Sequence, residues 1–308
     1  FSSLRKKFLI SNFQFLNKSQ IPNSQLKIKK FRIPPTLLEI LWNRFHILPI
    51  ENFIGEIDVF HTSDWTEPPA KCPKVTTIHD LAVLRYPESF PKKIVEVHKR
   101  KLALIKKETK MIIAVSESTK KDIVELLGIP EEKIRMIYEA AGEGFKPQTK
   151  EEIEEVKKKY KIAGDYLLAF SGPARKNLER IKIACKGFNL FVIGQPYVVP
   201  QDLPALYSGA LGLVYASLYE GFGLPILEAM ACGCPVVTSN VSSMPEVAGE
   251  AAVLVDPLSV EDIRKGIEKM LKDKEKLIKL GKKRCREFSW KKAAQQTLKV
   301  YEEAYQKY

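Results

Sequence analysis

Two glutamates, eight positions apart, frame a glycine-rich segment in the second half of the chain. Glu220 precedes Gly221-Phe-Gly-Leu-Pro225, and Glu228 follows it. Glycine allows positive φ and close approach of the backbone to a ligand, while proline suits the first turn of a helix, where its missing N–H costs nothing. The remaining N–H groups and the positive end of the helix dipole bind anions. The segment therefore predicts a phosphate site.

The side chain of Glu228 has apolar neighbours, among them Leu227 and Met230. A carboxylate in such a setting is costly unless it accepts hydrogen bonds, and the hydroxyls of a sugar or ribose are suitable donors. Taken singly, Glu220 could be a surface residue and Glu228 a helix residue paired with a lysine. The complete string Tyr219–Val237 favours a ligand site with a carboxylate on each side of the phosphate.

The elements that must position these residues follow an alternating pattern. A predicted strand at 211–216 leads into the glycine segment, and a predicted helix at 224–232 follows it. Such alternation along most of the chain predicts an α/β fold with parallel sheets and helices on both faces. Further strands are predicted at 57–61, 75–79, 111–115, 134–138, 166–170, 190–193, 235–238 and 252–255, and further helices at 93–107, 116–127 (with Ser116 in a capping box), 151–161, 177–186, 203–209 and 260–271, before an amphipathic tail at 274–308.

The length of 308 residues suits two domains, and the highly charged stretch 142–161 with its Gly and Pro marks the boundary between them. With 45% hydrophobic residues, wholesale disorder is excluded. In open α/β domains, ligands bind at the carboxyl ends of the strands. Two such domains are therefore expected to face each other across a cleft that holds the ligands.

The chain is strongly basic, with a net charge of +13, and eight Lys and Arg residues precede its first acidic residue, Glu39. Phe1, Phe8, Phe13 and Phe15 are interleaved with them. This pattern could indicate nucleic acid, an anionic membrane surface or anionic small substrates. No nucleic-acid motif accompanies the charges, so no nucleic-acid partner is predicted.

Cysteine usage and hydropathy bear on the compartment. The five cysteines show no metal-binding spacing and cannot all pair, which predicts a reducing cytoplasm. No apolar run reaches the roughly 20 residues that span a bilayer, and the first residues lack the features of a signal peptide. The chain starts with Phe1 and not with Met, so it is expected to be part of a longer protein.

The string from Tyr219 to Val237 resembles glycosyltransferase family 4, the glycosyl transferases group 1, which are retaining transferases that use nucleotide sugars. The resemblance runs from about Asp58 to Trp290. Further matches are Thr77-Ile-His-Asp80, Ala114-Val-Ser-Glu-Ser118, Arg175-Lys-Asn-Leu178, Asp202-Leu-Pro-Ala-Leu-Tyr-Ser208 and Met244-Pro-Glu-Val247.

The resemblance implies a GT-B fold, in which two Rossmann-like, doubly wound domains face a cleft. Residues 1–145 would form the acceptor-side domain and residues 146–290 the nucleotide-sugar-binding domain, with 291–308 a helix that packs back on the first. The family's N-terminal strand and glycine-rich loop are missing from residues 1–38, so the first domain is predicted to be incomplete. The segments 171–176 and 194–202 are also shorter than the resemblance implies.

The resemblance also implies roles for individual residues. Glu228 would bind the ribose hydroxyls and Glu220 the transferred sugar, while Lys176, with Arg175 beside it, would neutralise the phosphates. His79 would reach the donor sugar from the opposite domain, although a His that ends a strand is often structural. His79, Glu220 and Lys176 are thus the predicted catalytic residues, and the remaining predicted donor contacts are Arg175, Val199, Gly221, Phe222, Gly223, Leu224 and Glu228.

The positions of side chains at predicted strand ends bear on the acceptor side and on a metal or cofactor. His61, Asp64 and Trp65, with Asp80, are predicted on the acceptor side; Asp80 could instead orient His79 or cap the next element. No D-x-D pair ends a strand, so Lys176, Arg175 and the helix dipole would stabilise the leaving phosphate without a metal, and no cofactor is expected. Partners would be a nucleotide-sugar donor and a glycan or lipid-linked acceptor, with peripheral membrane contact through the basic N-terminal region.

The predicted function is therefore transfer of a hexosyl group, mannosyl among the candidates, in polysaccharide biosynthesis. One alternative is a nucleotide-sugar epimerase of the same architecture, which would release nucleotide without an acceptor. Another is a non-catalytic protein, either a degenerate nucleotide-sugar binder or a basic surface protein.

Overall fold

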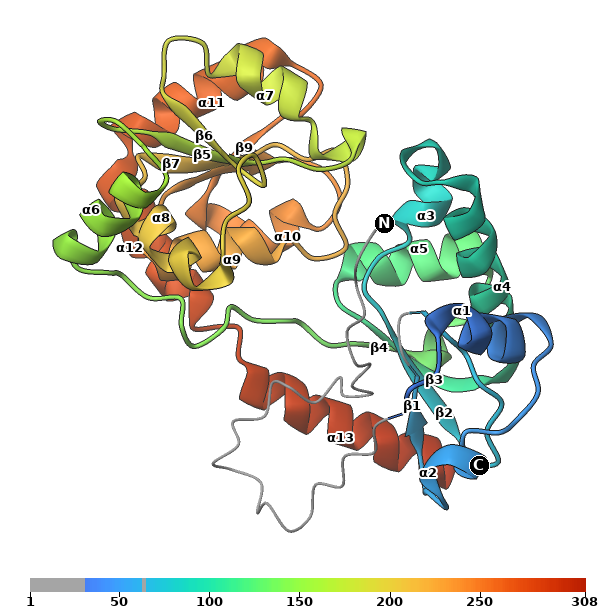
Figure 1. Ribbon diagram of the computed structural model, residues 1–308. Coiled ribbons are helices and arrows are strands. Elements are labelled where there is room, and N and C mark those ends of the chain that lie inside the picture. Colours follow the sequence, from blue (N-terminus) through green and yellow to red (C-terminus); the bar gives the residue numbers. More distant parts are fainter. Residues whose placement is uncertain (1–30, 63–64) are drawn as a thin grey trace. The chain divides into compact units, whose positions relative to one another are not determined.

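The computed structural model describes residues 31–62 and 65–308 (Figure 1). The chain forms two compact units. The first extends to Val115 and adds Lys120–Ile137 and Trp290–Tyr308; the second comprises Ser116–Thr119 and Tyr138–Ser289. The division after Ile137 precedes the predicted boundary after residue 145. Asp64, predicted on the acceptor side, lies outside the described residues.

The first unit contains a four-stranded parallel sheet in the order β1-β2-β3-β4. One face packs against helices through residues such as Ile105, Ile112 and Ile123. Edge strand β1 is shorter than predicted, because only Phe60 and His61 pair with β2. The strands are β1 (Phe60–His61), β2 (Lys74–Ile78), β3 (Thr109–Ala114) and β4 (Ile134–Met136), and the helices α1 (Pro35–Leu38), η1 (a π-helix, Glu39–Arg44), α2 (Glu51–Ile54), α3 (Ala82–Arg85), η2 (Pro87–Ser89), α4 (Lys92–Glu108), α5 (Glu117–Leu127) and η3 (Glu131–Lys133).

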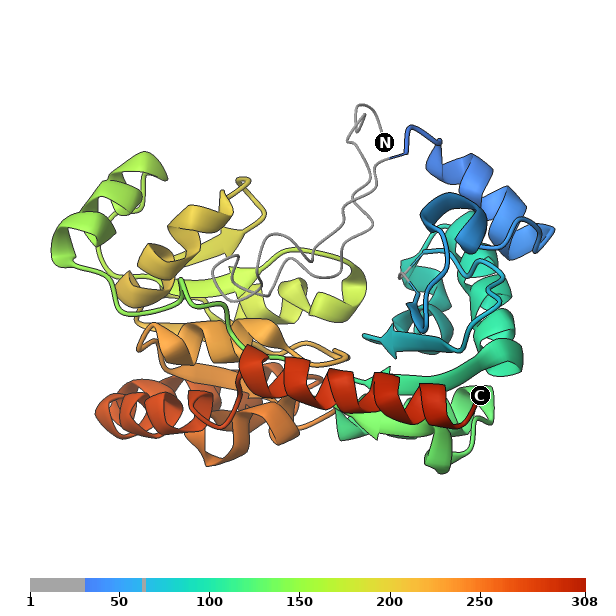
Figure 2. The ribbon, with the colours of Figure 1, turned by 90° about the horizontal axis from the view of Figure 1, so that it is seen from below.

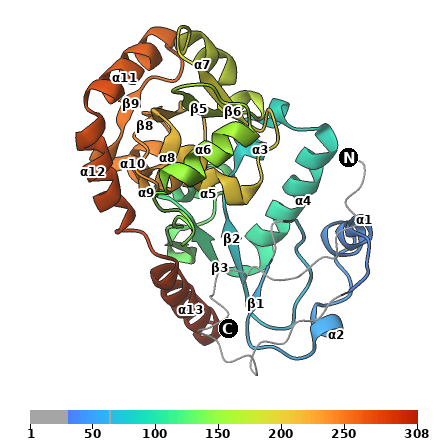
Figure 3. The same ribbon diagram turned by 60° about the vertical axis from the view of Figure 1, so that its left-hand side comes forward.

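The predicted tail at 274–308 forms two helices, α12 (Lys274–Cys285) and α13 (Trp290–Gln306). Helix α13 covers the other face of the first unit's sheet (Figures 2 and 3), where Val300 and Ala304 join Val75 and Met111 in one buried cluster. The last helix of the chain therefore completes the core of the first unit.

The second unit contains a five-stranded parallel sheet in the order β6-β5-β7-β8-β9. The chain leaves β5 for β6 on one side and then returns to β7 on the other side. This reversal is a topological switch point, and in open α/β sheets ligands bind at the carboxyl ends of the strands there. The strands are β5 (Leu167–Phe170), β6 (Leu190–Ile193), β7 (Gly212–Tyr215), β8 (Val236–Ser239) and β9 (Val253–Val255).

Helices cover both faces of this sheet (Figure 1). Helices α7 and α11 lie on one face, and α8, α9, α10 and α12 on the other. Thus the prediction of an α/β fold with parallel sheets is confirmed. The helices are α6 (Lys150–Lys159), η4 (Ala174–Lys176), α7 (Leu178–Ala184), η5 (Pro200–Asp202), α8 (Leu203–Gly209), α9 (Leu224–Ala231), α10 (Met244–Ala248), η6 (Gly249–Ala251) and α11 (Val260–Lys272).

Helix starts follow local capping chemistry. At α5, the predicted Ser116 cap is present, since Ser116 Oγ accepts from the Thr119 N–H at 3.0 Å. At α6, Thr149 and Glu152 form a full capping box, which starts the helix one residue earlier than predicted.

Candidate active site

The glycine loop leads from β7 into α9. Gly223 has φ +97° and ψ +45°, a left-handed conformation that favours glycine, and Pro225 lies in the first turn of α9. The N-cap residue of this helix is Gly223, which has no side chain with which to cap it. Phe222 is buried, with its ring 6.0 Å from that of Tyr138 and 5.9 Å from that of Phe288. The ring contacts of Phe222 thus fix the backbone next to Gly223. The N–H groups at the start of α9 are suited to bind an anion.

Two serines before α10 hold the carbonyl groups of this loop. Ser243 Oγ donates to the carbonyls of Glu220 and Phe222 at 2.9 and 2.8 Å. Ser242 Oγ donates to the Glu220 carbonyl at 2.6 Å and accepts from its N–H at 3.2 Å. Sequence analysis missed both serines, because their position before a helix indicates only a local cap.

A lysine that follows strand β5 forms an ion pair with a glutamate that follows the neighbouring strand β7. Lys176 Nζ lies 2.7 Å from Glu220 Oε1, and Glu220 is only 8% exposed. Lys176 follows β5 and Glu220 follows β7, so the pair sits at the switch point of the sheet. The structure therefore brings together two of the three predicted catalytic residues, which are 44 positions apart.

Two hydrogen bonds tie the loops that bear this pair. The Leu218 N–H donates to the Arg175 carbonyl at 2.7 Å, and Asn177 Nδ2 donates to the Ala216 carbonyl at 2.9 Å. Asn177 is buried with φ +60°, a conformation that asparagine tolerates better than most residues. Asn177 thus sets the position of Lys176, a role that an Asn after a Lys does not reveal in sequence.

A buried tyrosine contacts both members of the lysine–glutamate pair. Lys176 Nζ donates to Tyr215 Oη at 2.9 Å, and the Tyr215 hydroxyl bonds to Glu220. Burial, and then the charge of Glu220, raise the pKa of Tyr215 well above its usual value. The hydroxyl therefore stays protonated. Because Tyr215 lies inside a predicted strand, sequence analysis gave it no role.

Glu228 has a partner of its own. Tyr207 Oη donates to Glu228 Oε2 at 3.1 Å from helix α8. Burial raises the pKa of Glu228, and the bond from Tyr207 opposes that rise. Tyr207 lies in the segment 202–208, which is one of the matches to the family. Its contact with Glu228, however, could not be predicted from sequence spacing.

Two further predicted donor contacts lie in the second unit. Arg175 is half-buried in η4. Its positive charge lowers the pKa of Tyr215, but burial and the charge of Glu220 raise that pKa by more. Val199 precedes η5, and its N–H donates to Tyr160 Oη at 3.2 Å. A donor contact of Val199 stays a prediction.

The first unit holds the other predicted residues. His79 is exposed and directly follows β2, one residue beyond the strand that was predicted to end with it. Asp80 Oδ1 accepts from the Ala82 N–H at 2.8 Å, so the Asp80 side chain bonds to the first residue of α3, although Leu81 is the N-cap residue of that helix. Trp65 is exposed, and its ring packs against that of His98 at 5.3 Å.

His61 has internal partners in the first unit. Its Nδ1 lies 2.6 Å from Tyr301 Oη, and its Nε2 lies 3.0 Å from Thr77 Oγ1. These contacts make His61 a link between β1, β2 and α13. They give no support to its predicted acceptor-side role.

Within residues 31–62 and 65–308, no group of three or more His, Cys, Asp or Glu residues could hold a metal ion. Over the same residues, no helix combines the length and the apolar character needed to cross a membrane. All five cysteines are free thiols.

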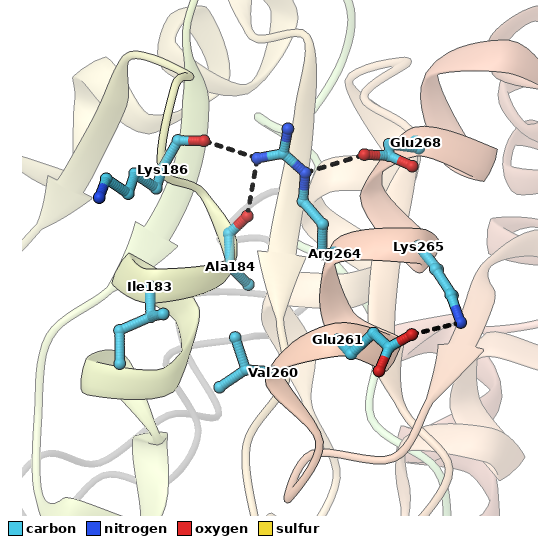
Figure 4. Close-up of a pocket in the computed structure, with 8 residues that line it drawn as sticks. All are labelled: Ile183, Ala184, Lys186, Val260, Glu261, Arg264, Lys265 and Glu268. Atoms are coloured by element: carbon cyan, nitrogen blue, oxygen red, sulfur yellow. Dashed lines mark hydrogen bonds and ion pairs between the residues drawn. The ribbon is translucent and has the colours of Figure 1, made fainter.

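A groove lies between α7 and α11, on the face of the sheet opposite α9 (Figures 1 and 4). Ile183 and Val260 line it, and Arg264 donates from one side to the carbonyls of Ala184 and Lys186. None of the predicted site residues lines this groove, so it is separate from the Lys176–Glu220 pair.

Comparisons with known proteins identify the family of this chain. Residues 17–140 match the model of Glycosyltransferase Family 4, and residues 146–285 match that of Glycosyl transferases group 1. The O-antigen chain mannosyltransferase B of Escherichia coli is 33% identical over 264 residues, which cover 74% of this chain and 69% of the relative. The serotype-specific mannosyltransferase WbdA of Escherichia coli is 31% identical over 65% of this chain, which spans 29% of that longer protein.

Solved structures share the fold. Sucrose-phosphate synthase from Thermosynechococcus elongatus aligns with a TM-score of 0.65 and 18% identity, over 84% of this chain and 76% of that structure. HepE from Anabaena, solved in complex with UDP and glucose, aligns with a TM-score of 0.61 and 18% identity, over 75% and 71%. With family models matched in both halves and a relative 33% identical over most of its length, the chain belongs to glycosyltransferase family 4, the glycosyl transferases group 1, and is a glycosyltransferase.

Proposed function

We propose that this chain transfers a hexosyl group, specifically mannosyl, from a nucleotide diphosphate sugar to a glycan or lipid-linked acceptor, with retention of configuration and without a metal. The observation that carries the proposal is the Lys176–Glu220 pair at the switch point, with Lys176 Nζ 2.7 Å from Glu220 Oε1 and with Glu220 on the loop that leads into α9. Two relatives named as mannosyltransferases support the choice of sugar. The O-antigen function in the name of the first supports a role in polysaccharide biosynthesis.

The chemistry follows from where charge develops. As the bond from the sugar to the phosphate breaks, negative charge grows on the diphosphate, and preorganised cations and helix N–H groups stabilise it. Lys176 and the uncapped start of α9 supply both kinds of group. Because an ammonium has three N–H donors and the contacts described here use two, for Tyr215 and Glu220, the third is suited to a phosphate oxygen.

The acceptor hydroxyl would attack the face of the sugar that the phosphate leaves, and a phosphate oxygen would take the hydroxyl proton. The new glycosidic bond and the released nucleoside diphosphate balance this step without a side-chain nucleophile. Glu220 would accept hydrogen bonds from the transferred sugar, and His79 remains a predicted contact of that sugar.

We expect this chain to transfer mannose from GDP-mannose, and not glucose from UDP-glucose, to a mannose-containing oligosaccharide. Transfer from UDP-glucose alone would overturn the choice of mannose. Product NMR should show the donor's anomeric configuration, and EDTA should leave the rate within about twofold of its original value. Epimerised sugar or free nucleotide formed without an acceptor would instead identify the epimerase alternative. Donor binding without turnover would identify a degenerate binder, and inversion or loss of activity in EDTA would overturn retention or metal independence.

We also propose peripheral contact with an anionic membrane through the basic N-terminal region, which lies outside the described residues up to residue 30, together with an apolar loop of the first unit. This apolar loop follows η1, and its residues Phe45, Ile47 and Leu48 are 60%, 49% and 42% exposed. Trp42 Nε1 donates to the Leu48 carbonyl at 3.1 Å, and His46 bonds to the Trp42 carbonyl and to Glu108.

These bonds hold the loop although His46 and Leu48 have positive φ, which is unfavourable for such residues. The exposed Arg44 lies beside it, and η1 packs next to the lysine-rich α4 (Figure 3). A fixed apolar protrusion among cations suits an anionic lipid surface.

The double variant Phe45→Ser and Ile47→Ser should lower partition into phosphatidylglycerol-containing vesicles by about 30-fold, since about 2 kcal/mol of apolar burial is lost. Sedimentation with vesicles measures this partition, which should weaken with added salt and in pure phosphatidylcholine. Ile183→Ser with Leu258→Ser removes two similarly exposed apolar side chains from the second unit and should have no effect. Equal losses in both double variants would refute the assignment to this loop.

A further inference from the structure

We propose that Tyr215 is a positioning residue for sugar transfer: its hydroxyl holds Lys176 and Glu220 in the arrangement that meets the donor. The inference rests on the proposed function, because it concerns the same pair of residues. It adds a role for a side chain that the chemistry of transfer does not itself require.

The three side chains form a closed set of contacts. Lys176 Nζ donates to Tyr215 Oη at 2.9 Å and to Glu220 Oε1 at 2.7 Å, while the Tyr215 hydroxyl bonds to Glu220. Lys176 Nζ also lies 5.1 Å from the centre of the Tyr215 ring, within the range of a cation–π interaction. Each member of the set thus contacts both of the others.

Tyr215 is the rigid member of this set. It is 2% exposed and is the last residue of β7, paired with Thr238 of β8, whose Oγ1 donates to the Tyr215 carbonyl at 3.0 Å. The ring packs edge-on against Phe170 at 5.9 Å. The ammonium of Lys176, by contrast, lies at the end of a flexible side chain at the last residue of η4, and that side chain loses rotamer freedom when it is held.

The arrangement has a consequence for the charge on Lys176. If Glu220 were its single acceptor, the Lys176 ammonium could rotate together with the Glu220 carboxylate. It could also move closer to that carboxylate and away from a phosphate. A neutral phenolic oxygen fixes a second N–H direction without cancelling any positive charge. The third N–H then has a set direction, and the Tyr215 hydroxyl at the same time orients Glu220.

A purely structural tyrosine would fill the core beside Phe170 and make the same bonds without consequence for transfer. The two roles differ in what loss of the hydroxyl changes. Tyr215→Phe keeps the ring and its packing but removes the contacts to Lys176 and Glu220. A structural role predicts lower stability with unchanged turnover, whereas a positioning role predicts slower turnover.

The chain offers a matched control in Tyr166. This tyrosine is also fully buried in the second unit, and its hydroxyl donates to the Leu206 carbonyl at 2.8 Å. Tyr166→Phe therefore deletes one buried hydroxyl away from the Lys176–Glu220 pair. Thermal unfolding followed by circular dichroism would show that both variants fold and how much stability each loses.

The test measures kcat and the donor KM for wild type, Tyr215→Phe, Tyr166→Phe, Lys176→Ala and the double variant with Lys176→Ala and Tyr215→Phe. The donor is GDP-mannose or UDP-glucose, whichever wild type uses. Tyr215→Phe should lower kcat about tenfold with KM within about twofold, as expected for contacts that matter in the transition state. Tyr166→Phe should keep wild-type kcat.

In the Lys176→Ala background, adding Tyr215→Phe should lower kcat by clearly less than the tenfold loss expected in wild type, because the effect through Lys176 is already lost and only the contact of Tyr215 with Glu220 remains. A wild-type kcat in Tyr215→Phe, or two losses that multiply in the double variant, would overturn the inference while leaving the proposed function intact. Absence of transfer by wild type on every donor would instead count against the proposed function.

Discussion

Replacing Lys176 with alanine is expected to lower kcat for sugar transfer by about 100- to 1000-fold, the loss typical of removing one group that stabilises developing charge. The side chain is 20% exposed, so water can replace its charge only in part. The variant also leaves the Glu220 carboxylate without its cation at the proposed diphosphate site, which adds repulsion. Initial rates at saturating donor measure the effect.

Lys182→Ala provides the matched control for a lost lysine charge. Lys182 lies in α7 of the same unit, and its partner is the exposed Glu179 at 3.1 Å. Because surface ion pairs contribute little, Lys182→Ala should change kcat by no more than about twofold. A Lys176→Ala kcat within tenfold of wild type would remove Lys176 from the catalytic residues.

Replacing Glu228 with alanine should weaken binding of the nucleoside diphosphates UDP or GDP by about 100-fold or more. A hydrogen bond to a charged group contributes about 1.5–3 kcal/mol, and the two ribose hydroxyls offer two such bonds. Calorimetric titration measures the affinity. The matched control is Glu179→Ala, which removes an exposed carboxylate from α7 and should leave the affinity unchanged. Wild-type affinity in Glu228→Ala would disprove the ribose contact.

The pH dependence of this affinity has a definite sign. Burial raises the pKa of Glu228 above its ordinary value of 4.5, and binding to hydroxyls requires the carboxylate. Nucleotide affinity should therefore fall as the pH drops through the raised pKa, at a midpoint above 4.5. The folding stability depends on pH with the opposite sign. Because the pKa of Glu228 is raised in the folded state, folding becomes less favourable as the pH rises from 4.5 through the raised pKa.

Tyr207 provides a way to move that midpoint. Its hydrogen bond lowers the pKa of Glu228, so Tyr207→Phe should shift the midpoint of nucleotide binding to higher pH. Tyr166→Phe should leave the midpoint in place. A downward shift in Tyr207→Phe would contradict Glu228 as the titrating group.

The parts of the site that the sequence could predict are local. A left-handed glycine at Gly223, a proline in the next turn and a strand before them are set by backbone preferences over a few residues. For the same reason β6 and α8 have their predicted bounds, at 190–193 and 203–209. The order of strands and helices, and the residues at the strand ends, could thus be predicted.

Only the tertiary structure decided which of these strand ends meet. The order β6-β5-β7 places Lys176 beside Glu220, and the packing of α8 on α9 brings Tyr207 to Glu228. Likewise, α13 brings Tyr301 to His61, 240 positions away. Propensity and periodicity extend over a few residues, whereas strand order and helix packing minimise exposed apolar surface over a whole unit, so the partners of each polar side chain emerge only once that unit is folded.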